Sequence, residues 1–366
     1  MIDFQETSLS EVDGEGWLEH RPSGFKLVEA NPAKKFLKGL YILDEPSLDL
    51  IYGSQEQREV AALVDLYAPP QTADSIKADP SVLADADVIF SGWGAPVMDE
   101  AFLQAASKLR AVFYAAGSIR SFTTEAFWDR NIVVTSAYAA NAIPVAEYTL
   151  SVILLSLKLF WRYSSEARMG HGWGDHTRPV PGSFKAKVGL VSCGMVARAT
   201  LKFLESFDIE RLVHCPFLSE AGARELNVRL CTLPELFREA DVVSLHTPVL
   251  PATRGLITGR LISSMKPNAT LINTARGAII KQSEMIEVLR KRTDLTAVLD
   301  VTDPEPPAAD CQLLALPNVV VTPHIAGSMG TEINRLGRYI VDELHRYIAG
   351  QPLKWQITRE LAATLA

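Results

Sequence analysis

The sequence predicts an α/β fold with two doubly wound parallel sheets, and two observations support this prediction. Short runs of β-branched and aliphatic residues alternate with helical patterns, which is typical of parallel strands joined by helical crossovers. The chain of 366 residues is also long enough for about two domains of average size. Its 48% of apolar and 22% of charged residues match a globular protein and exclude a disordered chain.

The first alternating block runs from about residue 36 to residue 145. The segment before it has no clear period, so we interpret residues 1–35 as an N-terminal extension. The predicted strands of the block are residues 40–43, 87–92, 111–116 and 132–137, and its predicted helices include residues 56–64 and 98–109.

The second block begins at Lys187 and predicts a six-stranded sheet. Its apolar runs are nearly continuous, as expected for strands that are buried on both faces. The helix between two of these runs has a clear start signal, because Thr232 and Glu235 are spaced as a capping box. The predicted strands are residues 187–191, 211–214, 241–246, 270–274, 297–301 and 319–322.

Between the two blocks, residues 161–184 are rich in Gly, Pro, His and Trp. This composition predicts a long surface loop or an arm that contacts another subunit, and Trp161 and Trp173 fit an interface better than a substrate cage. His171 and His176 lie in this segment without a third ligand, so we expect no metal site.

Charge and apolar patterning exclude several classes of partner. The net charge of −7 gives the chain no general attraction for nucleic acid or for an anionic membrane. The first twenty residues contain six acids and no Lys or Arg, which is the opposite of a secretory signal. The longest apolar stretch, residues 149–160, contains Lys158 and is shorter than a membrane span of ~20 residues. We therefore expect it to be a buried helix.

The four cysteines stand far apart in the sequence and form no C-x-x-C pair. This spacing predicts neither a disulfide framework nor a zinc site, and it favours a reducing, cytoplasmic setting. The residues are Cys193, Cys215, Cys231 and Cys311.

Polar side chains follow the predicted strands of the second block. Ligands of open parallel sheets bind beyond the carboxyl ends of the strands, so these residues should gather at one edge. An arginine, an acid and a histidine together point to a site that binds an anion and transfers a proton. The residues at these ends are Ser192, Cys193, Gly194, Cys215, Thr247, Thr274, Ala275, Arg276, Gly277, Asp300 and His324.

The turn after the first of these strands, residues 192–197, keeps little of the G-x-G-x-x-G pattern that cradles a diphosphate. The middle glycine, Gly194, is present, whereas Ser192 replaces the first glycine and would resist a positive φ. Cys215 stands where an acid would bind the ribose hydroxyls of NAD. No arginine stands beside Cys215 to bind the 2′-phosphate of NADP, and Arg224 is the nearest candidate. We therefore favour NAD without excluding NADP.

Several longer motifs resemble the signature segments of the D-isomer-specific 2-hydroxyacid dehydrogenases. The matching segments are L-I-N-T-A-R-G (271–277), V-L-D-V-T-D-P-E-P (298–306) and T-P-H-I-A-G (322–327), with shorter matches at 145–147, 241–248 and 265–267. The resemblance runs in order from about residue 85 to residue 355. It implies an NAD(P)-dependent enzyme that interconverts a 2-keto acid and a D-2-hydroxy acid.

The resemblance assigns catalytic roles to three residues. Arg276 would bind the substrate carboxylate and polarise the keto oxygen. His324 would protonate that oxygen as the hydride arrives, and Glu305 would stabilise the protonated imidazole. Formate dehydrogenases of this superfamily have Gln in place of Glu305, so Glu305 argues against that reaction.

The resemblance also implies where the ligands bind. The substrate carboxylate would meet the backbone N–H groups of Ala116, Gly117 and Ser118. The dinucleotide would lie against Gly194, Met195, Val196, Cys215, Thr247, Thr274, Ala275, Arg276, Asp300, His324, Ala326 and Gly327. Among the other strand-end residues, we interpret His246 as a packing residue beside the cofactor, and Trp93 could either wall the substrate pocket or serve no such role.

From the same resemblance we expect two Rossmann-like domains with a cleft between them. The substrate domain would comprise residues 36–145 and 327–352, with the dinucleotide domain, residues 146–326, inserted between these segments. Residues 353–366 would form a C-terminal tail, and the chain would be a homodimer. A second hypothesis is a dinucleotide-sensing interaction module like the C-terminal-binding corepressors. It predicts cofactor-dependent binding of a protein partner and no need for His324.

Overall fold

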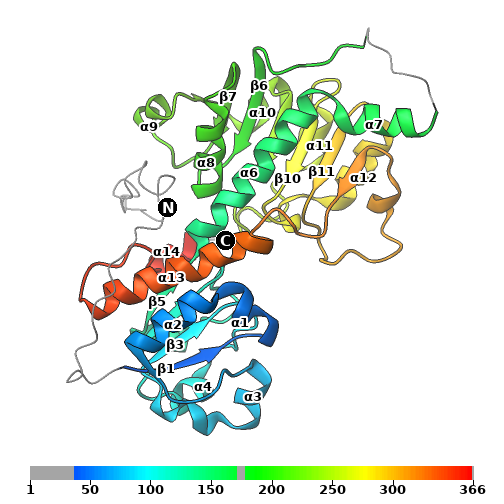
Figure 1. Ribbon diagram of the computed structural model, residues 1–366. Helices are drawn as coiled ribbons and strands as arrows, with labels where there is room; N and C mark the ends of the chain where they lie inside the picture. Colours follow the sequence, from blue (N-terminus) through cyan, green and yellow to red (C-terminus); the bar gives the residue numbers. More distant parts are fainter. Residues whose placement is uncertain (1–36, 171–177, 365–366) are drawn as a thin grey trace.

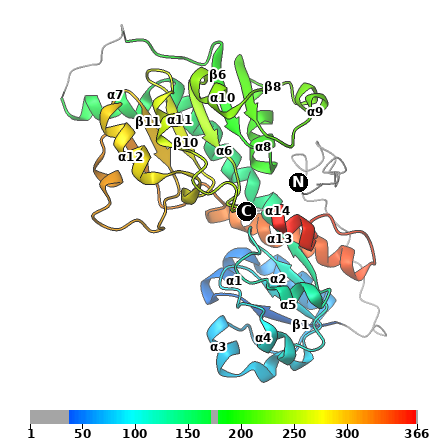
Figure 2. The same cartoon turned by 180° about the vertical axis from the view of Figure 1, so that it is seen from behind.

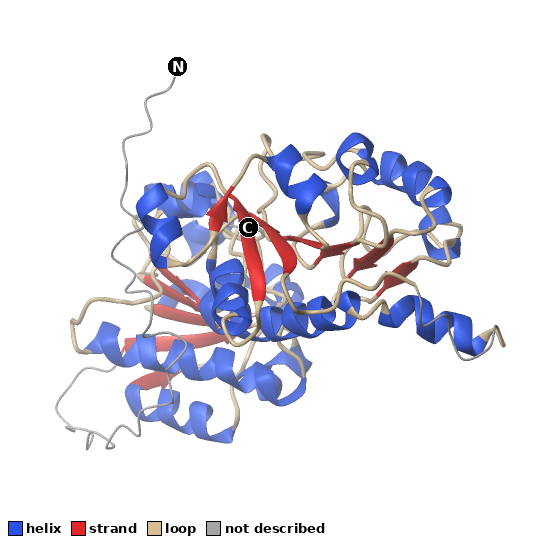
Figure 3. Cartoon of the chain, turned by 90° about the horizontal axis from the view of Figure 1, so that it is seen from above, coloured by secondary structure: helices blue, strands red, loops and turns tan. Residues whose placement is uncertain are grey.

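The computed structural model describes residues 37–170 and 178–364, and its strands form two separate sheets (Figure 1). The smaller sheet has the order β2-β1-β3-β4-β5 and the larger sheet has the order β12-β11-β10-β9-β6-β7-β8. All neighbouring strands in both sheets are parallel. Helices cover both faces of each sheet, as Figure 3 shows, and the predicted α/β class is confirmed.

The smaller sheet contains the four strands that the sequence predicts and one that it does not. The additional strand, β2 (Val64–Leu66), is a three-residue edge strand that directly follows a helix. The other strands are β1 (Leu37–Ile42), β3 (Val88–Ser91), β4 (Ala111–Tyr114) and β5 (Val133–Ser136). The helices around it are α1 (Glu45–Ile51), α2 (Ser54–Leu63), α3 (Ala73–Ala78), α4 (Glu100–Ala105) and α5 (Glu125–Asp129).

The larger sheet has seven strands rather than the predicted six, because the two residues of β8 (Arg229–Leu230) extend its edge. Its order reverses between β6 and β9, and such a switch point is where open α/β sheets bind ligands. The other strands are β6 (Ala186–Val191), β7 (Ile209–His214), β9 (Val242–Leu245), β10 (Thr270–Asn273), β11 (Thr296–Leu299) and β12 (Val319–Val321). The helices are α8 (Met195–Leu204), α9 (Glu220–Glu225), α10 (Leu233–Glu239), α11 (Gly259–Ser263) and α12 (Gln282–Lys291).

The larger sheet is buried on both faces, as its apolar runs predict. One face packs around Leu212, Leu271 and Leu299, and the other packs around Leu190 and Ile272. The capping box predicted at the start of α10 is also present, since Thr232 and Glu235 each bond the other's backbone N–H.

Two long helices connect the sheets, α6 (Tyr138–Leu157) and α13 (Ile333–Ile348), and they pack against each other (Figures 1 and 2). Helix α6 also packs on α8, next to the larger sheet. With 20 residues it is longer than the predicted apolar stretch, and by length and composition alone it could cross a membrane. More than half of its apolar window is nevertheless buried inside the fold, as expected for a core helix.

The C-terminal residues that we expected to form a tail instead complete the smaller unit. The backbone of Ser136 donates to Trp355 O at 3.1 Å, and Ile357 donates to Val134 O at 2.8 Å. The ring of Trp355 stacks on Tyr339 of α13, and α14 (Arg359–Thr364) follows. The predicted division at residue 353 is therefore not seen, because these contacts join the segment to β5.

The segment 161–184, predicted as a loop or arm, begins with a helix. Helix α7 (Phe160–Arg168) includes Trp161, whose indole N–H lies 3.4 Å from Ser156 Oγ. Residues 171–177, with His171, Trp173 and His176, lie outside the described residues, as does the predicted extension 1–35.

Candidate active site

A histidine and a glutamate from two loops of the larger sheet form a close pair. His324 follows β12 and Glu305 follows β11, and Nδ1 of His324 lies 2.5 Å from Oε1 of Glu305. Both side chains are partly exposed, at 48% and 40%. Nε2 of His324 has no partner among the described residues, so this nitrogen is available to exchange a proton with a ligand.

Asp300 positions the loop that carries His324. Its carboxylate is buried and accepts hydrogen bonds from Thr322 Oγ1 (2.6 Å), Ile325 N (2.8 Å) and Ala326 N (2.9 Å). The resemblance placed Asp300 among the residues that contact the dinucleotide, and in the structure its two oxygens bond residues on both sides of His324. The φ of His324 is +56°, an uncommon value for a residue with a side chain, and the bonds to Asp300 stabilise that backbone.

Two partners in this network were not predicted from the sequence. Thr322 Oγ1 also lies 3.0 Å from the hydroxyl of Tyr148, which belongs to α6. The side chain of Asn141, at the start of the same helix, accepts from Ser328 N at 2.9 Å. The His324 loop is thus connected to the helix that leaves the smaller sheet, and this contact depends on residues far apart in the sequence.

Arg276 lies in the turn after β10, and a buried asparagine shapes that turn. Asn273 donates to Arg276 O at 2.9 Å and accepts from Ala275 N at 3.1 Å. The next residue, Gly277, must be glycine, because a Cβ there would lie 2.0 Å from the carbonyl carbon of Thr302. The turn therefore packs directly against the chain that leads to Glu305.

The guanidinium of Arg276 retains most of its hydrogen-bonding capacity. Nη1 donates to Ala275 O at 2.7 Å, and no carboxylate of the described residues lies within ion-pair distance. Burial lowers the pKa of Arg276, and the charge of Glu305 acts in the opposite direction. A half-buried guanidinium with free N–H groups is suited to binding a carboxylate.

The turn between β6 and α8 fits the diphosphate of a dinucleotide. Gly194 is the N-cap of α8 and forms no side-chain cap, which leaves the first N–H groups of the helix, at Met195 and Val196, exposed to a ligand. No atom lies within 4 Å of the position that a Cβ of Gly194 would occupy. Arg198, which the sequence analysis did not single out, donates from Nε to Cys193 O at 3.2 Å and steadies the turn.

Ser192 has a φ of +84°, the conformation that its side chain disfavours. We expect Ser192→Gly to stabilise the protein by up to about 1 kcal/mol, because relief of this strain exceeds the entropy that glycine adds to the unfolded chain. Ser219→Gly is the matched control, since Ser219 has a φ of −71° and caps α9. It should destabilise the protein in the same urea titration, and a loss of stability in both variants would contradict the expectation.

The other predicted cofactor residues line the same edge. Thr247 Oγ1 donates to Val191 O at 3.2 Å, and Thr274 Oγ1 lies 3.3 Å from Thr149 Oγ1. Both hydroxyls therefore bond other parts of the protein. Ala275, Ala326 and Gly327 belong to the Arg276 and His324 loops, and Cys215 directly follows β7. The thiol of Cys215 is free, as are those of Cys193, Cys231 and Cys311.

His246, which we interpreted as a packing residue beside the cofactor, directly follows β9. Its Nε2 lies 3.0 Å from Ser244 Oγ, and burial lowers the pKa of His246 to about 4. Because the unfolded chain binds this proton near pH 6.5, the free energy of unfolding should fall by up to about 3 kcal/mol as the pH drops from 6.5 to 4. The variant His246→Gln should flatten this dependence in urea titrations across the pH range. An unchanged slope would contradict the assignment.

The predicted carboxylate loop of the smaller unit follows β4. Ser136, at the end of β5, donates to Ala116 O (2.9 Å) and Gly117 O (2.6 Å) and so orients the loop. The backbone N–H groups of Gly117 and Ser118 donate to no described group. They are free to bind an anion. Ser136 was not predicted, because its role depends on the pairing of β4 with β5.

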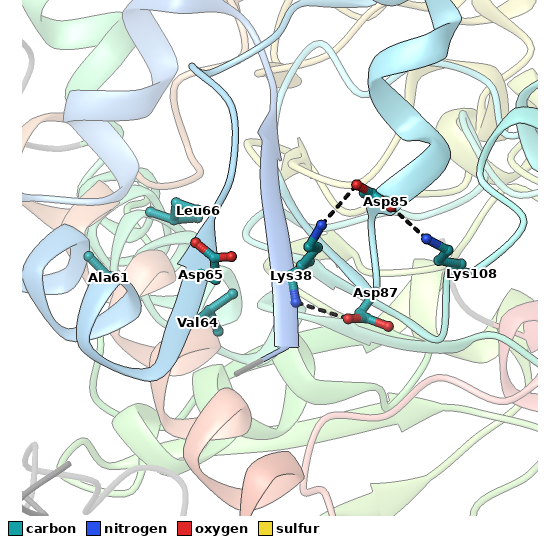
Figure 4. A pocket seen from close by; sticks show the side chains of 8 residues that line it. All are labelled: Lys38, Ala61, Val64, Asp65, Leu66, Asp85, Asp87 and Lys108. Atoms are coloured by element: carbon teal, nitrogen blue, oxygen red, sulfur yellow. Dashed lines mark hydrogen bonds and ion pairs between the residues drawn. The ribbon is translucent and has the colours of Figure 1, made fainter. Parts of the chain in front are cut away.

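A surface hollow lies at the opposite, amino-terminal end of the smaller sheet (Figure 4). Asp85 there pairs with Lys38 at 2.8 Å and with Lys108 at 2.5 Å, and these bonds lower the pKa of Asp85 to about 2. These paired charges stabilise the strand ends, and the hollow is remote from the loops that carry His324. The described residues contain no cluster of potential metal ligands.

Comparison with known proteins identifies the family. The family described as "D-isomer specific 2-hydroxyacid dehydrogenase, NAD binding domain" matches residues 150–326. A D-3-phosphoglycerate dehydrogenase of Methanocaldococcus jannaschii is 27% identical over 74% of this chain and 51% of its own length. A (S)-sulfolactate dehydrogenase of Chromohalobacter salexigens is 32% identical over 68% of this chain and 81% of its own length.

A solved structure supports the same conclusion at the level of the fold. The NAD-complexed D-isomer-specific 2-hydroxyacid dehydrogenase of Lactobacillus delbrueckii ssp. bulgaricus matches 88% of this chain and all of its own chain, with a TM-score of 0.72 and 19% identity. The chain spans about half the length of the curated phosphoglycerate dehydrogenases that it matches. Together with the sulfolactate dehydrogenase, these matches show that the chain belongs to the D-isomer-specific 2-hydroxyacid dehydrogenase family.

Proposed function

We propose that the protein is an NAD(P)-dependent enzyme that reduces a 2-keto acid to the D-2-hydroxy acid and catalyses the reverse reaction. The observation that carries this proposal is the His324–Glu305 pair, whose free Nε2 lies at the same sheet edge as Arg276. This edge combines a proton donor and a carboxylate-binding group, which the reduction of a keto acid requires.

Each residue has a distinct part in the reaction. A bound nicotinamide would supply the hydride, or accept it in the reverse direction. Arg276 binds the substrate carboxylate and polarises the keto oxygen, and the N–H groups of Gly117 and Ser118 bind the carboxylate from the smaller unit. His324 donates its proton from Nε2 to the keto oxygen, while Glu305 holds Nδ1 and stabilises the imidazolium.

The free N–H groups at the N-terminus of α8 indicate which residues would hold the cofactor. Gly194, Met195 and Val196 would bind the diphosphate, and the Arg276 and His324 loops would enclose the nicotinamide. The match to an NAD-binding domain supports NAD. Cys215 offers neither a carboxylate for the ribose hydroxyls nor a positive charge for a 2′-phosphate, so NADP must be tested as well.

We include a homodimer and a cytoplasmic location in the proposal. Phe160, Met169 and Phe184 expose large apolar side chains on α7 and the segment that follows it, which supports an interface there. The free cysteines support a reducing compartment, and the net charge of −7 supports a small-molecule rather than a nucleic-acid or membrane partner. Sedimentation velocity tests the dimer directly.

An activity screen tests the function. The full chain is mixed with NADH or NADPH and a panel of 2-keto acids that includes glyoxylate, pyruvate and hydroxypyruvate, and oxidation of the cofactor is followed at 340 nm. We expect turnover of at least one acid and a product of D configuration. If no acid oxidises either cofactor, the enzyme function is wrong. The corepressor-like alternative is not favoured, because the matched relatives are named as dehydrogenases.

A further inference from the structure

Three loops of the smaller unit place Asp44, Trp93 and Ala116 in one row. The strand register aligns Ile42 with Ser91, and Ser91 with Tyr114. Asp44, Trp93 and Ala116 each follow these aligned positions by two residues. Neighbouring strands lie about 4.8 Å apart, so Trp93 is about 5 Å and Asp44 about 10 Å from Ala116 along the row.

The loops that carry Asp44 and Trp93 are packed against each other. The backbone of Asp44 donates to Trp93 O at 2.9 Å. The following residue, Gly94, has a φ of +84°, and the carboxylate of Asp44 occupies the space where a Cβ of Gly94 would lie. The carboxylate and the indole ring therefore belong to one local structure.

Both side chains are available to a ligand. Trp93 is 38% exposed and lies between two glycines at a sheet edge. Asp44 is exposed, starts α1 without forming a side-chain cap, and has no ion-pair partner among the described residues. An unpaired carboxylate next to an exposed indole is an arrangement that attracts cations, through Coulomb attraction and through the face of the ring.

The same row offers little to an anion. Residues 43–46, 92–97 and 115–119, which form these strand ends, contain no Lys or Arg. The nearest arginine in sequence, Arg120, donates from Nη2 to Ala362 O and Ala363 O at the end of α14. A phosphate, sulfonate or second carboxylate placed along the row would therefore lie near the negative charge of Asp44. The three loops provide no Lys or Arg to neutralise the charge of such a ligand.

We infer that Trp93 and Asp44 form the subsite for the side chain of the substrate and select a 2-keto acid whose side chain ends in a cation over one that ends in an anion. This inference rests on the proposed function, because it takes the loop of Gly117 and Ser118 as the carboxylate site. A side chain that leaves this loop along the row meets the indole first and the carboxylate of Asp44 about 10 Å away. Six bonds of an extended chain span about 7 Å, and a hydrogen bond of about 2.9 Å between the terminal cation and the carboxylate covers the rest.

Three acids of similar length test the inference: 5-guanidino-2-oxopentanoate (cationic), 2-oxohexanoate (neutral) and 2-oxoadipate (anionic). Glyoxylate has no side chain, so its kcat/KM measures the activity that does not depend on the proposed subsite. For the wild type we expect kcat/KM to decrease in that order among the three acids. In Asp44→Asn, kcat/KM should fall about tenfold for the cationic acid and rise about tenfold for 2-oxoadipate, whereas glyoxylate should be unaffected.

Two further variants serve as comparisons. Asp49→Asn removes an exposed carboxylate on α1 that bonds Gln57 and lies away from the row, so it should leave the ranking unchanged. Trp93→Ala should reduce kcat/KM for the acids with long side chains and leave glyoxylate nearly unchanged. Thermal denaturation of each variant verifies folding.

The outcomes separate the inference from the proposed function. If neither glyoxylate nor any longer acid is reduced, the proposed function fails. If the acids are reduced but Asp44→Asn and Asp49→Asn give the same ranking as the wild type, the enzyme stands and the subsite is wrong. A wild type that prefers 2-oxoadipate would also overturn the subsite.

Discussion

Replacing His324 with glutamine is expected to lower kcat for reduction of the 2-keto acid by about 10²- to 10⁴-fold. Glutamine can still bond Glu305, but it cannot release a proton to the keto oxygen. The loss should appear in kcat, because His324 acts when the oxygen becomes negatively charged. Steady-state kinetics with a saturating keto acid measure it.

Binding of the dinucleotide separates a catalytic loss from a structural one. The diphosphate turn at Gly194 belongs to another loop, and glutamine keeps a side chain of similar size beside the nicotinamide, so the Kd for NADH from fluorescence titration should change far less than kcat. His345→Gln is the control, since His345 lies on α13 and is 3.6 Å from Glu59. If His324→Gln retains full kcat, the assignment of the proton donor is refuted.

Those parts of the fold that rest on local sequence could be predicted. The buried strands β6, β9 and β10 are short segments in which apolar and β-branched residues predominate, and this length and composition favour strands over helices. The capping box of α10 depends on four consecutive residues, and it too is present. Arg276, Glu305 and His324 were found because each lies in a motif that follows a strand.

The elements that were missed depend on tertiary contacts. Strands β2 and β8 have three and two residues, and they exist because a neighbouring strand provides hydrogen-bond partners. The C-terminal segment was predicted to be a tail, since nothing in its sequence shows that Trp355 stacks on Tyr339. The same holds for the site: Asp300 was recognised as a site residue, but its bonds to the backbone of Ile325 and Ala326 follow only from the folded loop.

The second large effect is expected at Arg276. The conservative change Arg276→Lys should lower kcat/KM by about 10²- to 10³-fold, because lysine replaces a planar fork of donors with a single flexible ammonium group. The geometry increases this cost. Nη1 of Arg276 already bonds Ala275 O, so the guanidinium is fixed in orientation while its other N–H groups remain free for a carboxylate and a keto oxygen. A lysine lacks the planar pair of N–H groups that binds a carboxylate through two parallel bonds.

A matched variant shows whether the loss is specific. Arg260 is an exposed residue of α11, and Arg260→Lys should leave kcat/KM unchanged. The turn that carries Arg276 is held by Asn273 and by the packing of Gly277, neither of which requires the guanidinium, so Arg276→Lys should unfold at the same urea concentration as the wild type. If kcat/KM remained within about twofold of the wild type, the carboxylate would have to be bound by Gly117 and Ser118 alone. In that case the assignment of Arg276 as a catalytic residue would be wrong.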